Sequence, residues 1–258
     1  MLALTTDQIV SFLGLFWWPF CRLMGAFALM PMLGSSYTPV TVRILLAASI
    51  SGILVPVLPA MPHIDPLSIQ GVLVAGEQML VGAMMALFVN MLIVTMTMIG
   101  AMMAMQMGLA MAMMNDPSSG SSNPIIGQWL LIYAILLFLS LDGHLVSIGI
   151  MVDSFHLWPV GSGVLGLPLM SLVSKFGWMF ASAFMVALPV IIAMLLVNIT
   201  FGVLSRAAPS LNVFALGFPM SMLMGLFCVL FSFSGLPSRY SDFCIEALQS
   251  MQNFIGGS

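Results

Sequence analysis

The sequence predicts an all-α, polytopic integral membrane protein. Three observations support this prediction: 61% of the 258 residues are hydrophobic, only 5% are charged, and the apolar residues lie in long unbroken runs. An ordinary soluble domain carries roughly 25% charged residues, and so few charges cannot cover a soluble body of this size. Within lipid, backbone polar groups need internal partners, which leaves helices or closed barrels. Barrel strands alternate polar and apolar residues, so the unbroken runs favour helices.

Prolines and glycines divide the chain into about six hydrophobic helical segments. Their approximate bounds are Gln8–Met30, Val40–Val55, Pro66–Pro117, Ile125–Leu141, Pro168–Leu204 and Leu211–Ser234. Four of them match the roughly 20 residues that cross about 30 Å of hydrocarbon. We expect one membrane domain, 1–258, with an N-terminal helical part (1–114), a polar loop region (107–124), a C-terminal helical part (125–234) and a final helix (235–258).

The third segment is too long for one membrane crossing. No proline lies between Pro66 and Pro117, and no charged residue lies between Glu77 and Asp116. About fifty residues of straight helix would extend roughly 75 Å at about 1.5 Å per residue. We therefore expect this segment either to fold back or to run beyond the bilayer inside a protein complex.

Two regions outside the long apolar runs have their own patterns. A glycine-rich connection is expected between Leu141 and Pro168. After Pro237, Ser238 is a candidate N-cap for an amphipathic helix. Its apolar positions are Cys244, Leu248, Met251 and Ile255. Because its polar face nearly lacks lysine and arginine, we expect it to dock on the protein's own body and not to anchor separately in the membrane.

A stripe of small residues lies near the end of the third segment. Gly100, Ala104, Gly108 and Ala112 recur every four residues and share one helical face. In a membrane, such a stripe lets another backbone approach closely. We expect it to be a helix-packing surface.

The same segment is rich in methionine. Two opposite helical faces carry these side chains: Met96, Met103, Met107, Met111 and Met114 on one, and Met98, Met102, Met105 and Met113 on the other. Thioethers are soft ligands that could suit Cu(I), but no cysteine or histidine supports them here. Methionine fills irregular, deformable contacts, so a compliant apolar seal is the better interpretation.

No pattern predicts catalysis, a resident metal or a cofactor. The strongest metal candidates are Asp142, His144, Asp153 and His156, of which only the last two have i, i+3 spacing. Hydrogen bonding at helix ends explains them better. Ser118–Gly120 lacks the strand-to-helix elbow of a catalytic serine. With a net charge of −3 and five basic residues, the chain has no nucleic-acid footprint. We expect a protein that is not an enzyme.

Three charged residues stand out. Arg22 and Glu77 lie within or beside apolar runs, where an unpaired charge costs about 2.5–3.5 kcal/mol by insertion scales. Each is therefore expected to have a partner, in this chain or in another subunit. Arg206 follows the fifth segment, where a basic side chain interacts favourably with the helix dipole.

Three stretches together resemble a known family. They are Gln106–Leu109 leading into Asn115–Pro117; Asp142–Leu145 followed by Val152–His156 and Pro159–Gly161; and Ala187–Val190 followed by Asn198, Leu204–Pro209, Leu211–Phe214 and Gly217–Pro219. Arg22, Pro31, Pro39 and Arg43 occur in matching order. Over nearly its whole length the chain resembles the FliR/SctT family of type III secretion export-gate subunits, and the third stretch resembles the flagellar members.

This resemblance implies a role in flagellum assembly. Members assemble with FliP and FliQ, beside FlhA and FlhB, into a gate through which unfolded flagellar proteins cross the inner membrane. The gate lies at the flagellar basal body in the bacterial inner membrane, in contact with lipid. The implied fold is a FliP-like part followed by a FliQ-like helical hairpin. Burial by neighbouring subunits would account for the overlong third segment.

The resemblance also implies a plug that closes the pore. Matched onto this chain, the plug covers about 107–124. Its candidate residues are Met107, Met111, Met113, Met114, Asn115, Asp116, Pro117, Gly120 and Pro124. A secondary transporter or ion channel is the alternative function, but it would need a self-contained site, usually with a functional intramembrane charge.

Overall fold

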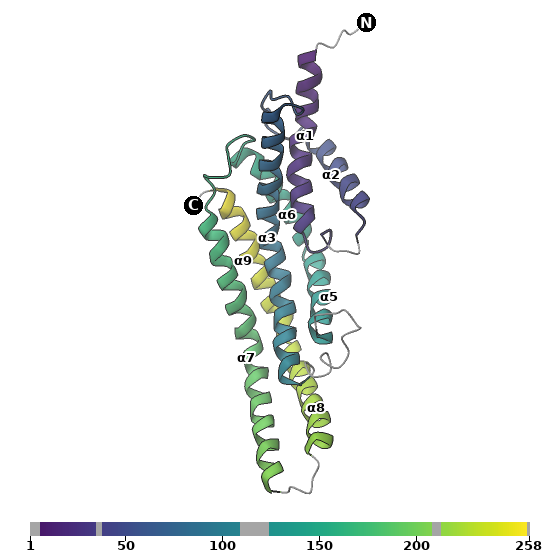
Figure 1. The fold of residues 1–258 in the computed structure, drawn as a ribbon, viewed down its shortest axis with the longest axis vertical. Coiled ribbons are helices and arrows are strands. Elements are labelled where there is room, and N and C mark those ends of the chain that lie inside the picture. The colour runs from purple at the N-terminus through teal and green to yellow at the C-terminus, as the bar shows by residue number, and fades with distance from the viewer. Residues whose placement is uncertain (1–5, 35–37, 109–123, 208–212, 257–258) are drawn as a thin grey trace. The chain divides into compact units, whose positions relative to one another are not determined.

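The computed structural model describes residues 6–34, 38–108, 124–207 and 213–256, and within these ranges all regular structure is α-helical (Figure 1). The helices are α1 (Thr6–Leu29), α2 (Val40–Leu54), α3 (Ile69–Gln106), α5 (Ile125–Ser140), α6 (Gly143–Leu157), α7 (Leu169–Ala207), α8 (Val213–Phe233) and α9 (Leu236–Gly256). The predicted all-α membrane fold is confirmed. By length and composition, α3 and α7 can each cross a membrane. The described residues offer up to four crossings if the bent pairs α5–α6 and α8–α9 each count as one.

The overlong third segment is a single helix where the structure describes it. α3 has 38 residues, which at about 1.5 Å per residue gives roughly 57 Å. Between Ile69 and Gln106 the chain therefore does not fold back. α3 ends at Gln106, two residues before Gly108, whose φ is +77° and whose N–H donates to the Met105 carbonyl at 3.1 Å. Glycine adopts this left-handed conformation without steric cost, which is why it commonly terminates helices.

The expected glycine-rich connection contains a helix. α6 occupies Gly143–Leu157, a helix that was not among the six expected segments. Asp142 has a φ of +55° and forms the turn between α5 and α6, a conformation that short polar side chains tolerate. Helix α6 buries a mixed face that includes Ser147 and Ser154 as well as Ile150, Met151 and Phe155. Hydropathy alone does not detect such a face.

The chain divides into two compact units, each discontinuous in sequence. Unit 1 comprises residues 1–91, 142–175 and 245–258, and unit 2 comprises 92–141 and 176–244. In unit 1, α1 packs against α2, and the large fully buried side chains are Trp18, Arg22, Leu23, Phe27, Met85, Phe88, Phe155 and Phe254. A charged residue thus lies among the largest core side chains of this unit.

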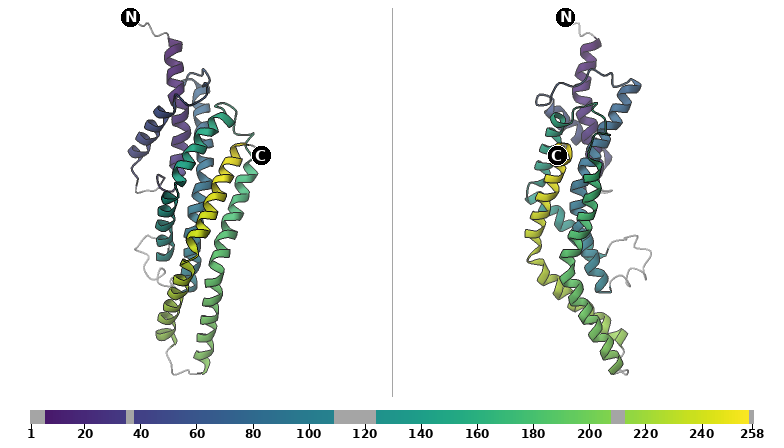
Figure 2. Two further views of the ribbon diagram at one scale, coloured as in Figure 1. Left: turned by 180° about the vertical axis from the view of Figure 1, so that it is seen from behind. Right: turned by 90° about the vertical axis from the view of Figure 1, so that its left-hand side faces the viewer.

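Unit 2 combines the second parts of α3 and α7 with α5, α8 and the start of α9. Trp129 and Tyr133 of α5 pack against Phe233 of α8, with ring centroids 5.2 and 4.9 Å apart. α8 runs back antiparallel to the second part of α7 (Figure 2). These contacts leave much of the α7 surface uncovered within the chain.

The C-terminal helix docks on the chain itself. Cys244, Leu248, Met251 and Ile255 are all buried, as the amphipathic pattern predicts. The predicted cap is wrong, because α9 begins at Leu236 and the Ser238 hydroxyl donates backwards to the Gly235 carbonyl at 3.0 Å.

Candidate functional site

α1 and α3 cross in unit 1 at a point where each contributes a glycine. A Cβ atom on Gly25 would collide with the backbone carbonyl of Met79, and one on Gly82 would collide with the backbone carbonyl of Arg22. The two helix backbones are therefore in direct contact. This contact holds the start of the Arg22 side chain against α3.

The Arg22 side chain lies at the centre of a buried polar network. Its Nε and Nη2 atoms both donate to the Gln78 side-chain oxygen on α3. Nη1 donates to the Ser154 hydroxyl on α6 at 2.8 Å, and Nη2 donates to the Trp158 carbonyl at 3.0 Å. The guanidinium also lies 4.0 Å from the centroid of the Phe155 ring, a cation–π contact. One fully buried side chain thus ties together α1, α3 and α6.

Glu77 joins the same network through Gln78. The Gln78 amide nitrogen donates to the Glu77 carboxylate at 3.4 Å, and the Gly163 backbone N–H donates to the same oxygen at 3.1 Å. The amide of Gln78 therefore accepts from the cation and donates to the anion. Arg22 and Glu77, both expected to have partners, lie in one network within this chain. Because four of its five N–H groups donate hydrogen bonds, the buried guanidinium avoids the penalty of an unpaired charge.

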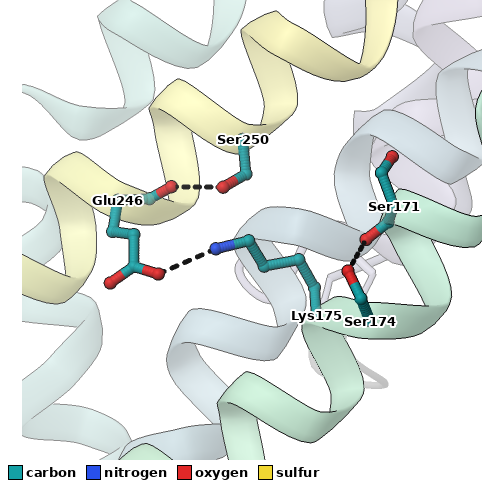
Figure 3. A network of polar contacts seen from close by, with 5 residues as sticks. All are labelled: Ser171, Ser174, Lys175, Glu246 and Ser250. Carbon is teal, nitrogen blue, oxygen red and sulfur yellow. Dashed lines mark hydrogen bonds and ion pairs between the residues drawn. The ribbon is translucent and has the colours of Figure 1, made fainter. Parts of the chain in front are cut away.

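An ion pair joins two other helices of unit 1. Lys175 of α7 donates to the Glu246 carboxylate of α9 at 2.9 Å (Figure 3), with 18% and 47% of the two side chains exposed. The Ser250 hydroxyl donates to the Glu246 backbone carbonyl at 2.6 Å. These charges are 71 positions apart in sequence, and no local pattern predicts their pairing.

The small-residue stripe of α3 lies in unit 2 at a second close helix approach. A Cβ atom on Gly100 would lie 2.6 Å from the Gly127 Cα on α5, and Ala104 is fully buried. Gly108 lies outside the helix, where its left-handed backbone ends α3. Ala112 lies outside the described residues.

The predicted plug region begins at Met107, shortly after the close contact between α3 and α5. Met107 is buried, and a Cβ atom on Gly225 of α8 would collide with its side chain. A Cβ atom on Gly108 would lie 3.3 Å from the Phe218 ring. Pro124 is buried immediately before α5. The other predicted plug residues lie outside the described ranges, namely Met111, Met113, Met114, Asn115, Asp116, Pro117 and Gly120.

The remaining candidates do not come together. Arg206 is exposed in the last turn of α7. Among the described residues, no group of three or more histidine, cysteine, aspartate or glutamate side chains could hold a metal ion.

Comparison with known proteins identifies the family of the chain. Residues 13–247 match the model of the bacterial export proteins, family 1. The chain belongs to this family. It is 32% identical to the flagellar biosynthetic protein FliR of Escherichia coli K12 over 99% of this chain and 96% of that protein. The FliR of Pectobacterium carotovorum is 32% identical over 88% and 87%, and that of Bacillus subtilis is 26% identical over 98% and 100%.

Membership of bacterial export family 1 confirms the predicted function as a flagellar export subunit. The apolar helices and these relatives make the chain a membrane-embedded flagellar component that associates with other export components. The relatives are named for flagellar biosynthesis and not for an enzymatic reaction.

Proposed function

We propose that this chain helps to form and to close the pore of a flagellar export gate, in a complex with FliP and FliQ in the bacterial inner membrane. Unfolded flagellar proteins are the cargo, and FlhA and FlhB are further components of the same apparatus. The membership of the export family supports the general role. The exposed surface of α7 supports the shared pore, and the end of α3 supports its closure.

The uncovered surface of α7 is the observation that carries the proposal. This helix has 39 residues, and only 28% of its most apolar stretch is buried within the chain. Large apolar side chains that are at least half exposed run along it: Phe180, Phe184, Met185, Ile192, Leu195, Leu196, Ile199 and Val203. At roughly 58 Å, the helix is longer than the 30 Å or so of hydrocarbon. Neighbouring subunits as well as lipid must therefore cover it.

The end of α3 supports a role for 107–124 in closing the pore. The left-handed Gly108 stops the helix at the start of this region, and Asn115–Pro124 contains two prolines and almost no apolar side chains. Such a segment persists at membrane depth only inside protein or beside a water-filled cavity. The preceding methionines supply deformable apolar contacts. In the proposal, this region obstructs the closed pore and moves aside during export.

The polar network of unit 1 argues against the alternative of a secondary transporter. Transporters bind substrate near the membrane midplane, usually with broken helices and a functional charge. Arg22 is the fully buried charge of the described residues, and its guanidinium donates four hydrogen bonds to acceptors of its own chain. A cation with these internal hydrogen bonds holds helices together and is not available to bind a substrate.

Co-purification tests the complex. Expressed together with FliP and FliQ and extracted in mild detergent, the chain should elute with both subunits as one stable particle. Recovery as a monomer or homodimer that binds a solute would support the transporter instead.

Conductance tests the plug. Deletion of Ser118–Ser122 should leave the complex intact and raise its ion conductance in planar bilayers. Alanine at Met111, Met113 and Met114 should have a milder effect in the same direction. Met105→Ala is the matched control, since this α3 methionine is 62% exposed and precedes the plug. A deletion variant that assembles normally and conducts no more than the parent would show that the loop is only a connector.

A further inference from the structure

A pocket of about 380 Å³ in unit 2 is not accounted for by the export function. It opens where α7 passes the junction between α8 and α9. One wall is apolar and includes Val186, Leu236 and Phe243. The remaining wall carries polar groups of three kinds: a guanidinium, two hydroxyls and a backbone carbonyl without a helical donor.

The two hydroxyls belong to Ser182 and Ser232, which both line the pocket. Ser182 is only 8% exposed. Most helical serines among the described side chains donate to a backbone carbonyl three or four residues earlier, as Ser171 and Ser174 do. Within the described part of the chain, neither Ser182 nor Ser232 makes a side-chain hydrogen bond. Both hydroxyls line the pocket, so the pocket has unused hydrogen-bonding capacity.

Pro189 leaves one backbone carbonyl of α7 without its helical hydrogen bond. Proline has no backbone N–H, so inside α7 it leaves the carbonyl four residues earlier, that of Met185, without its helical donor. Met185 and Pro189 both line the pocket. The freed acceptor is therefore available to a donor group of a bound molecule.

Arg239 supplies the positive charge. It lies in the first turn of α9, where the helix dipole adds to a positive potential. Its side chain is exposed and reaches the pocket. The α8–α9 pair is a candidate membrane span. Arg239 lies near the junction of the two helices, where a basic side chain in an apolar surrounding needs an anionic or polar partner. The pocket thus combines a cation, hydroxyl donors and an apolar wall.

We propose that this pocket binds an anionic phospholipid. The phosphate accepts from Arg239 and from the Ser182 and Ser232 hydroxyls. A glycerol headgroup donates to the Met185 carbonyl, and one acyl chain lies along Val186 and Phe243. A free phosphate would use the polar groups but leave the apolar wall bare, whereas a phospholipid uses both. The lipid would hold α7 against the α8–α9 junction.

Lipid retention tests this assignment on the full-length chain purified in mild detergent. Native mass spectrometry after addition of phosphatidylglycerol or phosphatidylcholine gives the bound fraction of each. The parent protein should retain phosphatidylglycerol preferentially. Arg239→Gln should weaken that retention about tenfold and Ser182→Ala about threefold, since hydrogen bonds to charged groups are the stronger ones.

Two further variants control for indirect effects. Arg206→Gln removes an exposed arginine that does not line the pocket and should leave retention unchanged. Val186→Trp fills the apolar wall while leaving every polar group in place, and it should also reduce retention. Equal retention of both lipids by the parent protein, unchanged retention in Arg239→Gln, or release of phosphatidylglycerol by millimolar inorganic phosphate would each overturn the proposal.

Discussion

Helices α3 and α7 are nearly equal in length and composition but differ in what covers them. They have 38 and 39 residues, and their most apolar stretches have mean hydropathies of 2.2 and 2.6. In α3, 61% of that stretch is buried within the chain, whereas in α7 only 28% is buried. The same kind of sequence thus serves as an internal scaffold in one helix and as an outer surface in the other. Hydropathy does not distinguish these roles, because it records only the preference for an apolar surrounding and not which molecule supplies it.

Of the changes that test the buried helix α3, removal of Arg22 should lower the stability of the protein most. Arg22→Ala leaves the buried Gln78 and Ser154 side chains and the partly buried Trp158 carbonyl without their donor. The expected loss in the free energy of unfolding is about 3–5 kcal/mol. Unfolding by a denaturing detergent, followed by tryptophan fluorescence, measures it. Arg206→Ala, an exposed site, should change the same quantity by less than about 0.5 kcal/mol. If both variants are equally stable, the network does not hold α3.

A matched pair of leucines tests the comparison directly. Leu92 of α3 is fully buried, and Leu196 of α7 is 62% exposed. Leu92→Ala opens a cavity and should lower the free energy of unfolding by roughly 3 kcal/mol. Leu196→Ala should change it by less than about 0.5 kcal/mol while lowering the yield of complex with FliP and FliQ. Equal destabilisation of the isolated chain by both variants would contradict the difference between the helices.

A matched pair of glycines on α3 tests the helix crossing. Gly82→Ala forces the Arg22 backbone away and should lower the free energy of unfolding by about 2 kcal/mol. A Cβ atom on Gly76, six residues earlier, would meet nothing within 4 Å. Gly76→Ala should therefore raise the free energy of unfolding by about 0.5–1 kcal/mol, through helix propensity. Both are measured in the same unfolding assay, and opposite signs are the result expected.

The ion pair between α7 and α9 should have the smallest effect. Lys175 and Glu246 are partly exposed, and such pairs contribute about 0–1 kcal/mol. A double-mutant cycle with Lys175→Met and Glu246→Gln should give a coupling free energy of about 0.5 kcal/mol that decreases with added salt. A coupling above about 2 kcal/mol, independent of salt, would show that this pair belongs to the scaffold.

The helices could be predicted from the sequence because their signals are local. The absence of proline after Pro66 predicts a long α3, and the apolar spacing after Ser238 predicts the buried face of α9. Helix α6 was missed because serine and glycine interrupt its apolar residues. The helix starts after Pro39, Pro124 and Pro168 agree with the structure to within a few residues, whereas α3 ends at Gln106, well before Pro117.

The buried polar network around Arg22 could be predicted only in part. The position of Arg22 in an apolar run predicts that it needs partners, but Gln78 and Ser154 lie 56 and 132 positions away. The crossing of α1 and α3 could not be predicted, because the contacts of Gly25 with Met79 and of Gly82 with Arg22 depend on tertiary structure. The Gly100 stripe was visible from its spacing, whereas its contact with Gly127 depends on tertiary structure.

The discontinuity of unit 1 has a consequence for biosynthesis. Phe254 of α9 packs against Phe88 of α3 with ring centroids 5.4 Å apart, and both side chains are almost fully buried. A ribosome makes residues 245–256 only after every other part of this unit. The earlier helices therefore enter the membrane with the surface for α9 uncovered, and they wait there while unit 2 is translated. Unit 1 can therefore close only after residues 245–256 have been translated.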